Sequence, residues 1–379
     1  MRKRKVLALL LALALVALML VGCGGMQPNN QQNNTANNET NNQENENSGT
    51  AAGTYKLGLG IVNSIEKSKD YQPAEGDNPE VLPVGQVDTT MAAVLFDADG
   101  KVVDVIIDVA QIRVNFDADL KVTNRDAELK SKKELGPDYG LINASEIGKE
   151  WYEQIEALEA WMVGKTVSEI TGMKTFERDP SHLHVPDEPD LKSSVTITVE
   201  AYLAAVEKAF ANAIEVEGAE KLGLGNKSSI AKSKDYQPAE GDNPEVLPVA
   251  QVDTVITATA FDADGKVVGT IIDNAQIRVN FDAEGKVTNR DAELKTKKEL
   301  GPDYGLINAS EIGKEWHEQI EALEDWMVGK TVSEITGMKT FERDPSHLHV
   351  PDVPELKSSV TITVEDYLEV VAEAYERAR

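Results

Sequence analysis

The stretch Lys56-Leu57-Gly58-Leu59-Gly60 decides how the chain is organised, because it returns 165 residues later as Lys221-Leu222-Gly223-Leu224-Gly225. The likeness continues over residues 121–187, where only three of 67 positions differ from their counterparts: Ser131/Thr296, Tyr152/His317 and Ala160/Asp325. A period of this length far exceeds the roughly 20–50 residues of solenoid repeats. The sequence therefore predicts two tandem domains with separate cores, one over residues 54–218 and one over 219–379.

Each repeat is predicted to be α+β, with a small antiparallel sheet and helices. Two β-rich runs, 87–96 and 101–108, flank Asp97-Ala98-Asp99-Gly100, which is a hairpin turn signal and lacks the further ligands of a calcium-binding loop. A third strand is expected around residues 111–116, because Ile112, Val114 and Phe116 alternate with Gln111, Arg113 and Asn115.

Helices are predicted in the second half of each repeat. Residues 146–163 carry an apolar stripe at helical spacing, made of Trp151, Ile155, Leu158 and Met162. Thr166-Val167-Ser168-Glu169 is a capping box for a short helix that ends near Gly172. Residues 193–197 are predicted to be extended, and a last helix is expected over 199–213 with Thr198 as its N-cap.

The first 53 residues differ in composition from the repeats. Four basic residues, 2–5, precede sixteen apolar ones, which is short of the roughly twenty that span a membrane. Residues 1–22 are therefore interpreted as a lipoprotein signal peptide and Cys23 as the lipidated anchor; the alternative is a small apolar residue in a membrane helix. The Asn- and Gln-rich remainder, up to residue 53, is predicted to be a disordered tether.

Charge and cysteine content exclude several classes of protein. The formal net charge is −27, and it becomes −31 when the four basic residues of the signal peptide are removed. Such a charge repels nucleic-acid phosphate, so no nucleic-acid partner is expected. One cysteine excludes an internal disulfide framework, a cysteine-rich zinc site and a cysteine-ligated iron–sulfur cluster.

Some residues have both a chemical and a plain interpretation. His182 and His184, repeated at His347 and His349, could bind a transition metal, but no third His or Cys lies nearby in the sequence, so no metal is predicted and an exposed polar loop is favoured. Trp151 is expected to pack in the core, while Trp161 lies off that stripe. Arg113 and Arg278 could meet an anion or form a cross-strand ion pair.

The strongest signal is a Ser/Thr cluster ahead of the last helix of each repeat. It reads Asp190-Leu191-Lys192-Ser193-Ser194-Val195-Thr196, and its counterpart is Glu355-Leu356-Lys357-Ser358-Ser359-Val360-Thr361. Free backbone N–H groups and the positive dipole end suit a helix N-terminus to an anion. Thr196 and Thr361 could carry a phosphoester there; otherwise these residues only cap a helix and fill the end of a strand.

This cluster resembles the attachment motif of FMN-binding domains that carry flavin on a threonine phosphoester, Asp-x-x-Ser/Thr-Gly-Ala-Thr followed by a helix. Asp190, Ser193 and Thr196 match it, as do Glu355, Ser358 and Thr361, while Ser194 and Ser359 replace the Gly, Val195 and Val360 replace the Ala, and Glu355 replaces the Asp. The run Leu20-Val21-Gly22-Cys23, which resembles a bacterial lipobox, the tether and the runs at 133–140 and 147–151 are similar to lipoproteins of Gram-positive flavin-based extracellular electron transfer, whose signal peptide encodes a pheromone.

The resemblance implies two covalent FMN groups per chain, on Thr196 and Thr361, attached by a separate FMN transferase with Asp190 and Glu355 in support. It implies electrons from a membrane NADH dehydrogenase and the quinone pool, delivered to soluble flavin, ferric iron or another extracellular acceptor. The chain would then be a redox carrier on the outer face of the cell membrane rather than a substrate-specific enzyme. The alternative is a non-redox surface lipoprotein that binds a small ligand or a cell-wall partner.

Overall fold

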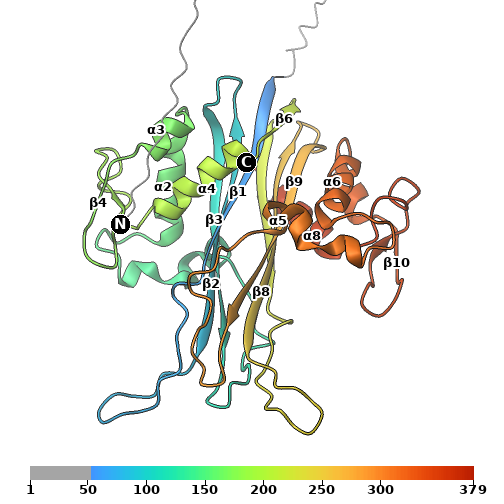
Figure 1. The fold of residues 1–379 in the computed structure, drawn as a ribbon. Coiled ribbons are helices and arrows are strands. Elements are labelled where there is room, and N and C mark those ends of the chain that lie inside the picture. The colour runs from blue at the N-terminus through green and yellow to red at the C-terminus, as the bar shows by residue number, and fades with distance from the viewer. Residues whose placement is uncertain (1–52) are drawn as a thin grey trace, which may run out of the picture. The chain divides into compact units, whose positions relative to one another are not determined.

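Two antiparallel sheets lie face to face at the centre of the folded region, with helices on the outer side of each (Figure 1). This computed structural model describes residues 53–379, so the predicted signal peptide, Cys23 and all of the tether but Gly53 lie outside the described residues. Helices and antiparallel sheets occur together in each repeat, which confirms the α+β prediction. No helix within residues 53–379 is long and apolar enough to cross a bilayer.

The first sheet has the strand order β3-β2-β1-β6, and the second has the order β7-β8-β9. The strands of the first are β1 (Thr54–Ser64), β2 (Val84–Phe96), β3 (Val102–Asn115) and β6 (Ile214–Glu217). Those of the second are β7 (Lys221–Ser229), β8 (Val249–Phe261) and β9 (Val267–Asn280). Each repeat also has a two-stranded hairpin, β4 (Thr175–Phe176) with β5 (Val185–Pro186), and β10 (Thr340–Phe341) with β11 (Val350–Pro351).

The helices of the two repeats correspond one to one. Those of the first repeat are α1 (Lys132–Leu135), α2 (Trp151–Met162), α3 (Val167–Thr171) and α4 (Glu200–Ala211), with 3-10 turns η1 (Gly136–Tyr139) and η2 (Leu141–Asn143) after α1. Those of the second are α5 (Lys297–Leu300), α6 (Trp316–Met327), α7 (Val332–Thr336) and α8 (Glu365–Glu376), with η3 (Gly301–Tyr304) and η4 (Leu306–Asn308) after α5.

The Leu-Gly-Leu-Gly motif lets a helix pack directly on a strand. In β1, Leu57 and Leu59 are buried between the sheets, while Gly58 and Gly60 alternate to the other face. A Cβ on Gly60 would lie 1.8 Å from the carbonyl oxygen of Ala205 in α4. Gly225 stands in the same relation to Val370 of α8, at 1.9 Å. These glycines therefore set the close approach of the last helix of each repeat to its sheet.

The central core is shared by the two repeats, so the prediction of separate cores is wrong. Buried residues from both, among them Leu57, Met91, Leu222 and Ile256, form one cluster between the sheets. Only the outer clusters, between each sheet and its own helices, belong to a single repeat. Each sheet is apolar on both faces. The helices of its own repeat cover the outer face, and the sheet of the other repeat covers the inner face.

The two repeats meet through reciprocal contacts, as subunits do across a twofold axis. Arg125 pairs with Asp235 at 2.8 Å, and their counterparts Arg290 and Asp70 pair at 2.9 Å. Equivalent positions also meet each other: the rings of Phe116 and Phe281 lie edge to face, and a Cβ on Gly85 would lie 2.2 Å from the Cβ of Ala250. The duplicated chain thus folds as an internal pseudo-dimer.

Several local predictions are confirmed, three are wrong, and the helix expected over 146–163 is shorter, since α2 begins at Trp151 and ends at Met162. Asp97 closes the β2–β3 turn by accepting from the backbone N–H groups of Asp99 and Lys101, and the Thr166–Glu169 capping box is present. The second and third predicted strands are one continuous strand, β3. Residues 193–197 form turns and irregular backbone rather than a strand. Val199, not Thr198, occupies the N-cap of α4, without a side-chain hydrogen bond.

Candidate functional site

Thr196 and Thr361 lie in the irregular segment between the small hairpin and the last helix of each repeat. Leu191 and Val195 fix this segment in the first repeat by burying their side chains against the sheet-and-helix core. At its end, the backbone N–H of Val199 donates to the carbonyl of His184 at 2.9 Å, which ties the start of α4 to the hairpin. Thr196 is half-buried between these two attachments.

A buried glutamine holds each threonine. The Gln154 amide oxygen accepts from the backbone N–H of Thr196 at 2.9 Å and from its hydroxyl at 3.3 Å. Gln319 makes the same two bonds to Thr361. Both glutamines are fully buried in the helices α2 and α6. Because the hydroxyl donates to the amide, the lone pairs of its oxygen stay free.

An arginine lies against the backbone of each threonine. Arg178 Nη1 donates to the carbonyl of Thr196 at 3.0 Å, and Arg343 Nη1 does so to the carbonyl of Thr361 at the same distance. Asp179 and Asp344 orient these guanidinium groups through their Nε atoms, at 3.3 and 3.2 Å. Each arginine thus brings a fixed positive charge beside a threonine.

In the second repeat, Thr361 opens into a cavity of about 560 Å³. Arg343 and Lys357 supply positive charge to its lining and Glu311 and Asp352 supply negative charge, while Phe341, Val350 and Val360 supply apolar surface. Lys357 is held by Asp352 at 3.0 Å, and Phe341 is 44% exposed. A cavity of this volume, mostly apolar with a few charged groups, is typical of small-molecule sites.

The remaining predicted motif residues lie around the threonines without converging on them. Asp190, Ser193, Glu355 and Ser358 are exposed. Ser194 and Ser359 are half-buried, and each hydroxyl donates at 3.3 Å to the carbonyl of the leucine three residues earlier. Their hydroxyls therefore stabilise the turn that precedes the threonine.

The helix N-terminus is less suited to an anion than the sequence indicated. Glu200 occupies the first turn of α4, and Glu365 and Asp366 occupy that of α8. Carboxylates there already interact with the positive dipole end. Glu200 also lies 3.6 Å from His184, and Glu365 lies 3.4 Å from His349. Positive charge at the threonines comes from Arg178 and Arg343 instead.

The two histidines of each pair have separate partners. His182 Nδ1 lies 2.8 Å from Asp179, and His184 Nδ1 lies 3.5 Å from the hydroxyl of Thr175. The hydrogen bond from His182 is the largest cause that lowers the pKa of Asp179, to about 2. Residues 53–379 hold no group of three or more His, Cys, Asp or Glu side chains suited to a metal ion.

The tryptophans and the mid-strand arginines have partners within their own repeat. Trp151 is buried and donates through Nε1 to the hydroxyl of Tyr202 at 3.0 Å, as its place on the apolar stripe predicts. Trp161 is half-buried, with the Lys165 ammonium 4.4 Å from its ring centroid. Among the described residues, Arg113 and Arg278 form no cross-strand ion pair: Arg113 Nε donates to Gln86 at 2.9 Å, and Arg278 Nε does so to Gln251.

The glutamine and the arginine of each site were missed from the sequence. Gln154 carries a readable signal, because it is a polar residue within the apolar stripe of α2, between Trp151 and Ile155. Arg178 lies in a loop eighteen residues before Thr196 and has no periodic pattern, so only the hairpin geometry brings it near.

No family model matches the chain. Among curated proteins, a chlorophenol reductase of Desulfitobacterium hafniense is 37% identical over 94 residues, in a match that covers 22% of this chain and 28% of that protein. The match thus spans about a quarter of the relative's length. Among solved structures, neutral ceramidase of Pseudomonas aeruginosa aligns over 58% of this chain and 31% of its own, at 12% identity and a TM-score of 0.19, too low to carry a structural argument.

Proposed function

We propose that the chain is a lipid-anchored electron carrier with one FMN covalently attached to Thr196 and one to Thr361. The observation that carries this proposal is the arrangement at each threonine, repeated in both halves. A hydroxyl is held by a buried glutamine, and a guanidinium lies at the same residue's carbonyl.

The residues around Thr361 fit a phosphate-linked flavin. Arg343 and Lys357 supply positive charge beside the threonine, partly balanced by Glu311 and Asp352, and this suits the single negative charge of a phosphodiester. Phe341, Val350 and Pro351 offer apolar surface to a ring, and the cavity of about 560 Å³ falls within the range of small-molecule sites. The partial likeness to a protein named as a reductase is in keeping with a redox role.

In this proposal the bound flavin supplies the electron chemistry, and the protein tethers it and sets its surroundings. Gln319 orients the Thr361 hydroxyl for esterification, while Arg343 and Lys357 balance the charge of the phosphate. Asp190 and Glu355 are exposed, so in this proposal a separate FMN transferase could reach them. Electrons would come from a membrane NADH dehydrogenase through quinone and pass to ferric iron or soluble flavin outside the cell, with Cys23 as the lipid anchor.

Intact mass spectrometry of the mature protein, produced with an FMN transferase and FAD, tests the attachment. We expect two FMN-phosphoryl adducts in the wild type and one in each of Thr196→Ala and Thr361→Ala. Because the two sites are equivalent, each single variant should keep about half of the flavin absorbance after denaturation.

Thr198→Ala and Thr363→Ala are matched controls, because each removes a half-buried threonine two residues further on. Both should keep two adducts. A colourless wild type, or adducts that persist in the Thr196→Ala, Thr361→Ala double variant, would contradict the proposal. A colourless wild type would favour the alternative of a non-redox surface lipoprotein.

A further inference from the structure

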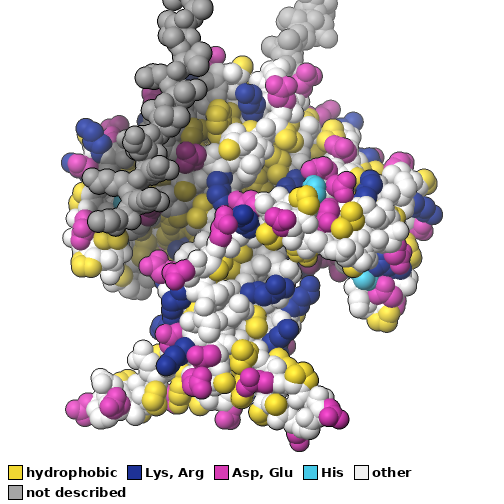
Figure 2. Space-filling model, in the orientation of Figure 1, with side chains coloured by type: hydrophobic (Ala, Val, Ile, Leu, Met, Phe, Trp, Pro, Cys, Tyr) yellow, Lys and Arg dark blue, Asp and Glu magenta, His cyan; other side chains and the backbone are white. Residues whose placement is uncertain are grey.

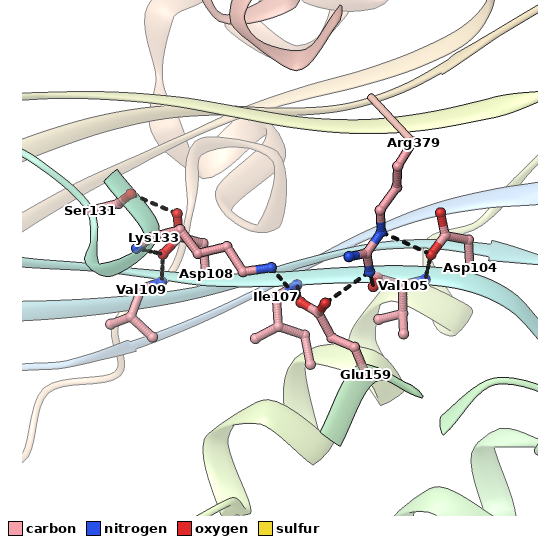
Figure 3. Close-up of polar contacts among 9 residues, drawn as sticks. All are labelled: Asp104, Val105, Ile107, Asp108, Val109, Ser131, Lys133, Glu159 and Arg379. Carbon is pink, nitrogen blue, oxygen red and sulfur yellow. Dashed lines mark hydrogen bonds and ion pairs between the residues drawn. The ribbon is translucent and has the colours of Figure 1, made fainter. Parts of the chain in front are cut away.

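Equivalent glutamates of α2 and α6 bond to the edge strands β3 and β9, and the two glutamates have different surroundings. In the first repeat, Glu159 of α2 accepts from the backbone N–H of Ile107 at 2.7 Å and from Lys133 at 2.6 Å. Arg379 then donates to the other carboxylate oxygen of Glu159 at 2.8 Å. Figure 3 shows the guanidinium lying between Glu159 and Asp104 at the edge of β3. One guanidinium thus meets two carboxylates and the carbonyl of Val105.

The second repeat keeps the glutamate but not the guanidinium. One oxygen of Glu324, in α6, accepts from the backbone N–H of Ile272 at 2.5 Å and from Lys298 at 2.7 Å, as the equivalent oxygen of Glu159 does from Ile107 and Lys133. Lys298 also donates at 3.0 Å to the other oxygen of Glu324, whose equivalent in Glu159 binds Arg379. The place of Asp104 is taken by Gly269, and no arginine is among the described residues at this position. A cavity of about 710 Å³ opens here instead.

Glu324 and Asp325 line this cavity, together with Glu321, Gly269, Thr270 and Ile214. Ile214, in β6, is the counterpart of Arg379 by the repeat offset, so an apolar side chain stands where the first repeat has its guanidinium. Glu324 is 9% exposed, and Lys298 is the one basic residue of the lining. The cavity therefore presents more negative than positive charge.

Within the segment that the repeats share most closely, two of the three differences line this cavity. The segment is residues 121–187 and 286–352, and the two positions are Thr296 and Asp325. Asp325 replaces Ala160 and so adds a carboxylate one residue after Glu324. The second repeat has lost one carboxylate at Gly269 and gained another at Asp325.

We propose that this cavity binds a ligand bearing a monosubstituted guanidinium group, with Glu324 and Asp325 in the roles that Glu159 and Asp104 have toward Arg379. The acidic lining alone would not identify a ligand. The equivalent carboxylate of the first repeat, Glu159, does identify one. It binds the guanidinium of Arg379 beside a backbone N–H and a lysine that are equivalent to those at Glu324. A planar fork of N–H donors matches carboxylates better than a compact ammonium does. The site is separate from the threonine residues of the proposed flavin sites.

Isothermal titration of the wild-type protein with butylguanidinium, at about pH 8 and low salt, tests the proposal. We expect one site per chain, with butylammonium and butylurea at least tenfold weaker, because the first lacks the planar fork and the second lacks the charge. Asp325→Ala restores the residue of the first repeat at an exposed position, so it should fold and bind at least tenfold more weakly. Glu324→Gln should weaken binding in the same direction.

Arg379→Ala provides the matched positive control. It vacates the guanidinium position at Glu159, so butylguanidinium should then occupy two sites per chain. Binding to Arg379→Ala at one site with none in the wild type would overturn the proposal, because the chemistry would work at Glu159 and fail at Glu324. Equal affinity for the three probes, or unchanged affinity in Asp325→Ala and Glu324→Gln, would also overturn it.

Discussion

At the scale of single residues, the glutamine behind each threonine connects the buried core to the candidate site. Gln154 and Gln319 are fully buried, and the amide oxygen of each accepts hydrogen bonds from one threonine. Their amide nitrogens reach the carbonyls of Lys149 and Lys314, at 3.3 and 3.2 Å. A buried polar side chain with both ends bonded fixes the backbone on either side of it.

Gln154→Leu should impair flavin attachment at Thr196 and leave Thr361 unaffected. The change removes the acceptor of both the Thr196 N–H and its hydroxyl, so the threonine loses its fixed orientation, and stability should fall by about 1–3 kcal/mol. Peptide mass mapping after production with the transferase would measure each site separately, and the intact second repeat is the internal control. Equal loss at both threonines would contradict a local role for Gln154.

Gly60→Ala tests the direct packing of α4 on β1. The added Cβ would lie 1.8 Å from a backbone oxygen, so helix and strand must separate, and we expect a loss of about 2–4 kcal/mol in the free energy of unfolding. Gly76→Ala is the control: an added Cβ would meet nothing within 4 Å, and the positive φ of +60° should cost an alanine roughly 1–2 kcal/mol. Urea unfolding of both variants gives the comparison, and equal losses would show that space at Gly60 is not limiting.

Glu324 should make stability depend on pH between about 4.5 and 7. Burial raises its pKa to about 7, against the opposing effect of Lys298. The folded state therefore binds this proton more tightly than the unfolded state, and stability falls as the pH rises through that window. At about 1.4 kcal/mol per unit, the wild type should lose a few kcal/mol at most relative to Glu324→Gln between pH 5 and 7.5.

Glu373, whose pKa burial also raises to about 7, titrates in the same window. The difference between wild type and Glu324→Gln isolates Glu324, because Glu373 contributes to both curves. Urea unfolding at a series of pH values measures it. Parallel stability curves for the two proteins would mean that Glu324 is ionised in the folded state throughout.

At the scale of elements, the sequence predicts best where one local pattern is sufficient. The β2–β3 turn, the stripe of α2 and the capping box of α3 depend on residues within four or so positions of one another, and all three are confirmed. The break expected between residues 108 and 111 is wrong, because Asp108 is buried within β3. Its carboxylate accepts from the Ser131 hydroxyl at 2.6 Å and from the backbone N–H of Lys133 at 3.0 Å.

The errors share a cause, which is that long-range contacts satisfy groups that local patterns leave open. Thr198 reads as an N-cap, but the backbone N–H of Val199 is already bonded to His184 in the hairpin. The threonines of the candidate site are recognisable from their motif, while Arg178 and the cavity depend on the tertiary fold. The packing of one repeat against the other could likewise not be predicted from the sequence. Apolar residues in a strand indicate that a sheet face is buried, but not which element covers it.

Thr166→Ala should destabilise α3 by about 1 kcal/mol. The Thr166 side chain accepts from the backbone N–H of Glu169, and the Glu169 carboxylate accepts from that of Thr166 at 2.8 Å, so the change leaves one end of the box open. Thermal unfolding of Thr166→Ala and Thr166→Ser would measure the contribution, since serine keeps the acceptor. Equal melting temperatures for the two variants would contradict a capping role.

At the scale of the whole molecule, the shared core makes the repeats one folding unit. Half of the central cluster belongs to each repeat, so unfolding one sheet exposes the inner face of the other. Figure 2 shows Asp and Glu side chains spread among Lys and Arg over one face of the molecule. The shared core, rather than the surface, is the basis for expecting a single cooperative transition.

Calorimetry should therefore show one transition over residues 53–379, with equal calorimetric and van't Hoff enthalpies. A chain of residues 54–218 alone should form a homodimer, because its Arg125 and Asp70 are the two halves of the reciprocal pairs and its inner face is apolar. Sedimentation equilibrium would measure this. Two separate transitions, or a stable monomer of residues 54–218, would show that each repeat folds by itself.

The contact between Gly85 and Ala250 has a consequence for how the two repeats can change in sequence. In a true homodimer, a residue on the twofold axis meets its own copy, so every mutation there is made twice and an alanine at this position would have to face another alanine. After a gene duplication within one chain, each copy mutates alone, and glycine can stay opposite alanine. The same independence allows Arg379 to fill one sheet edge while the other edge keeps a cavity.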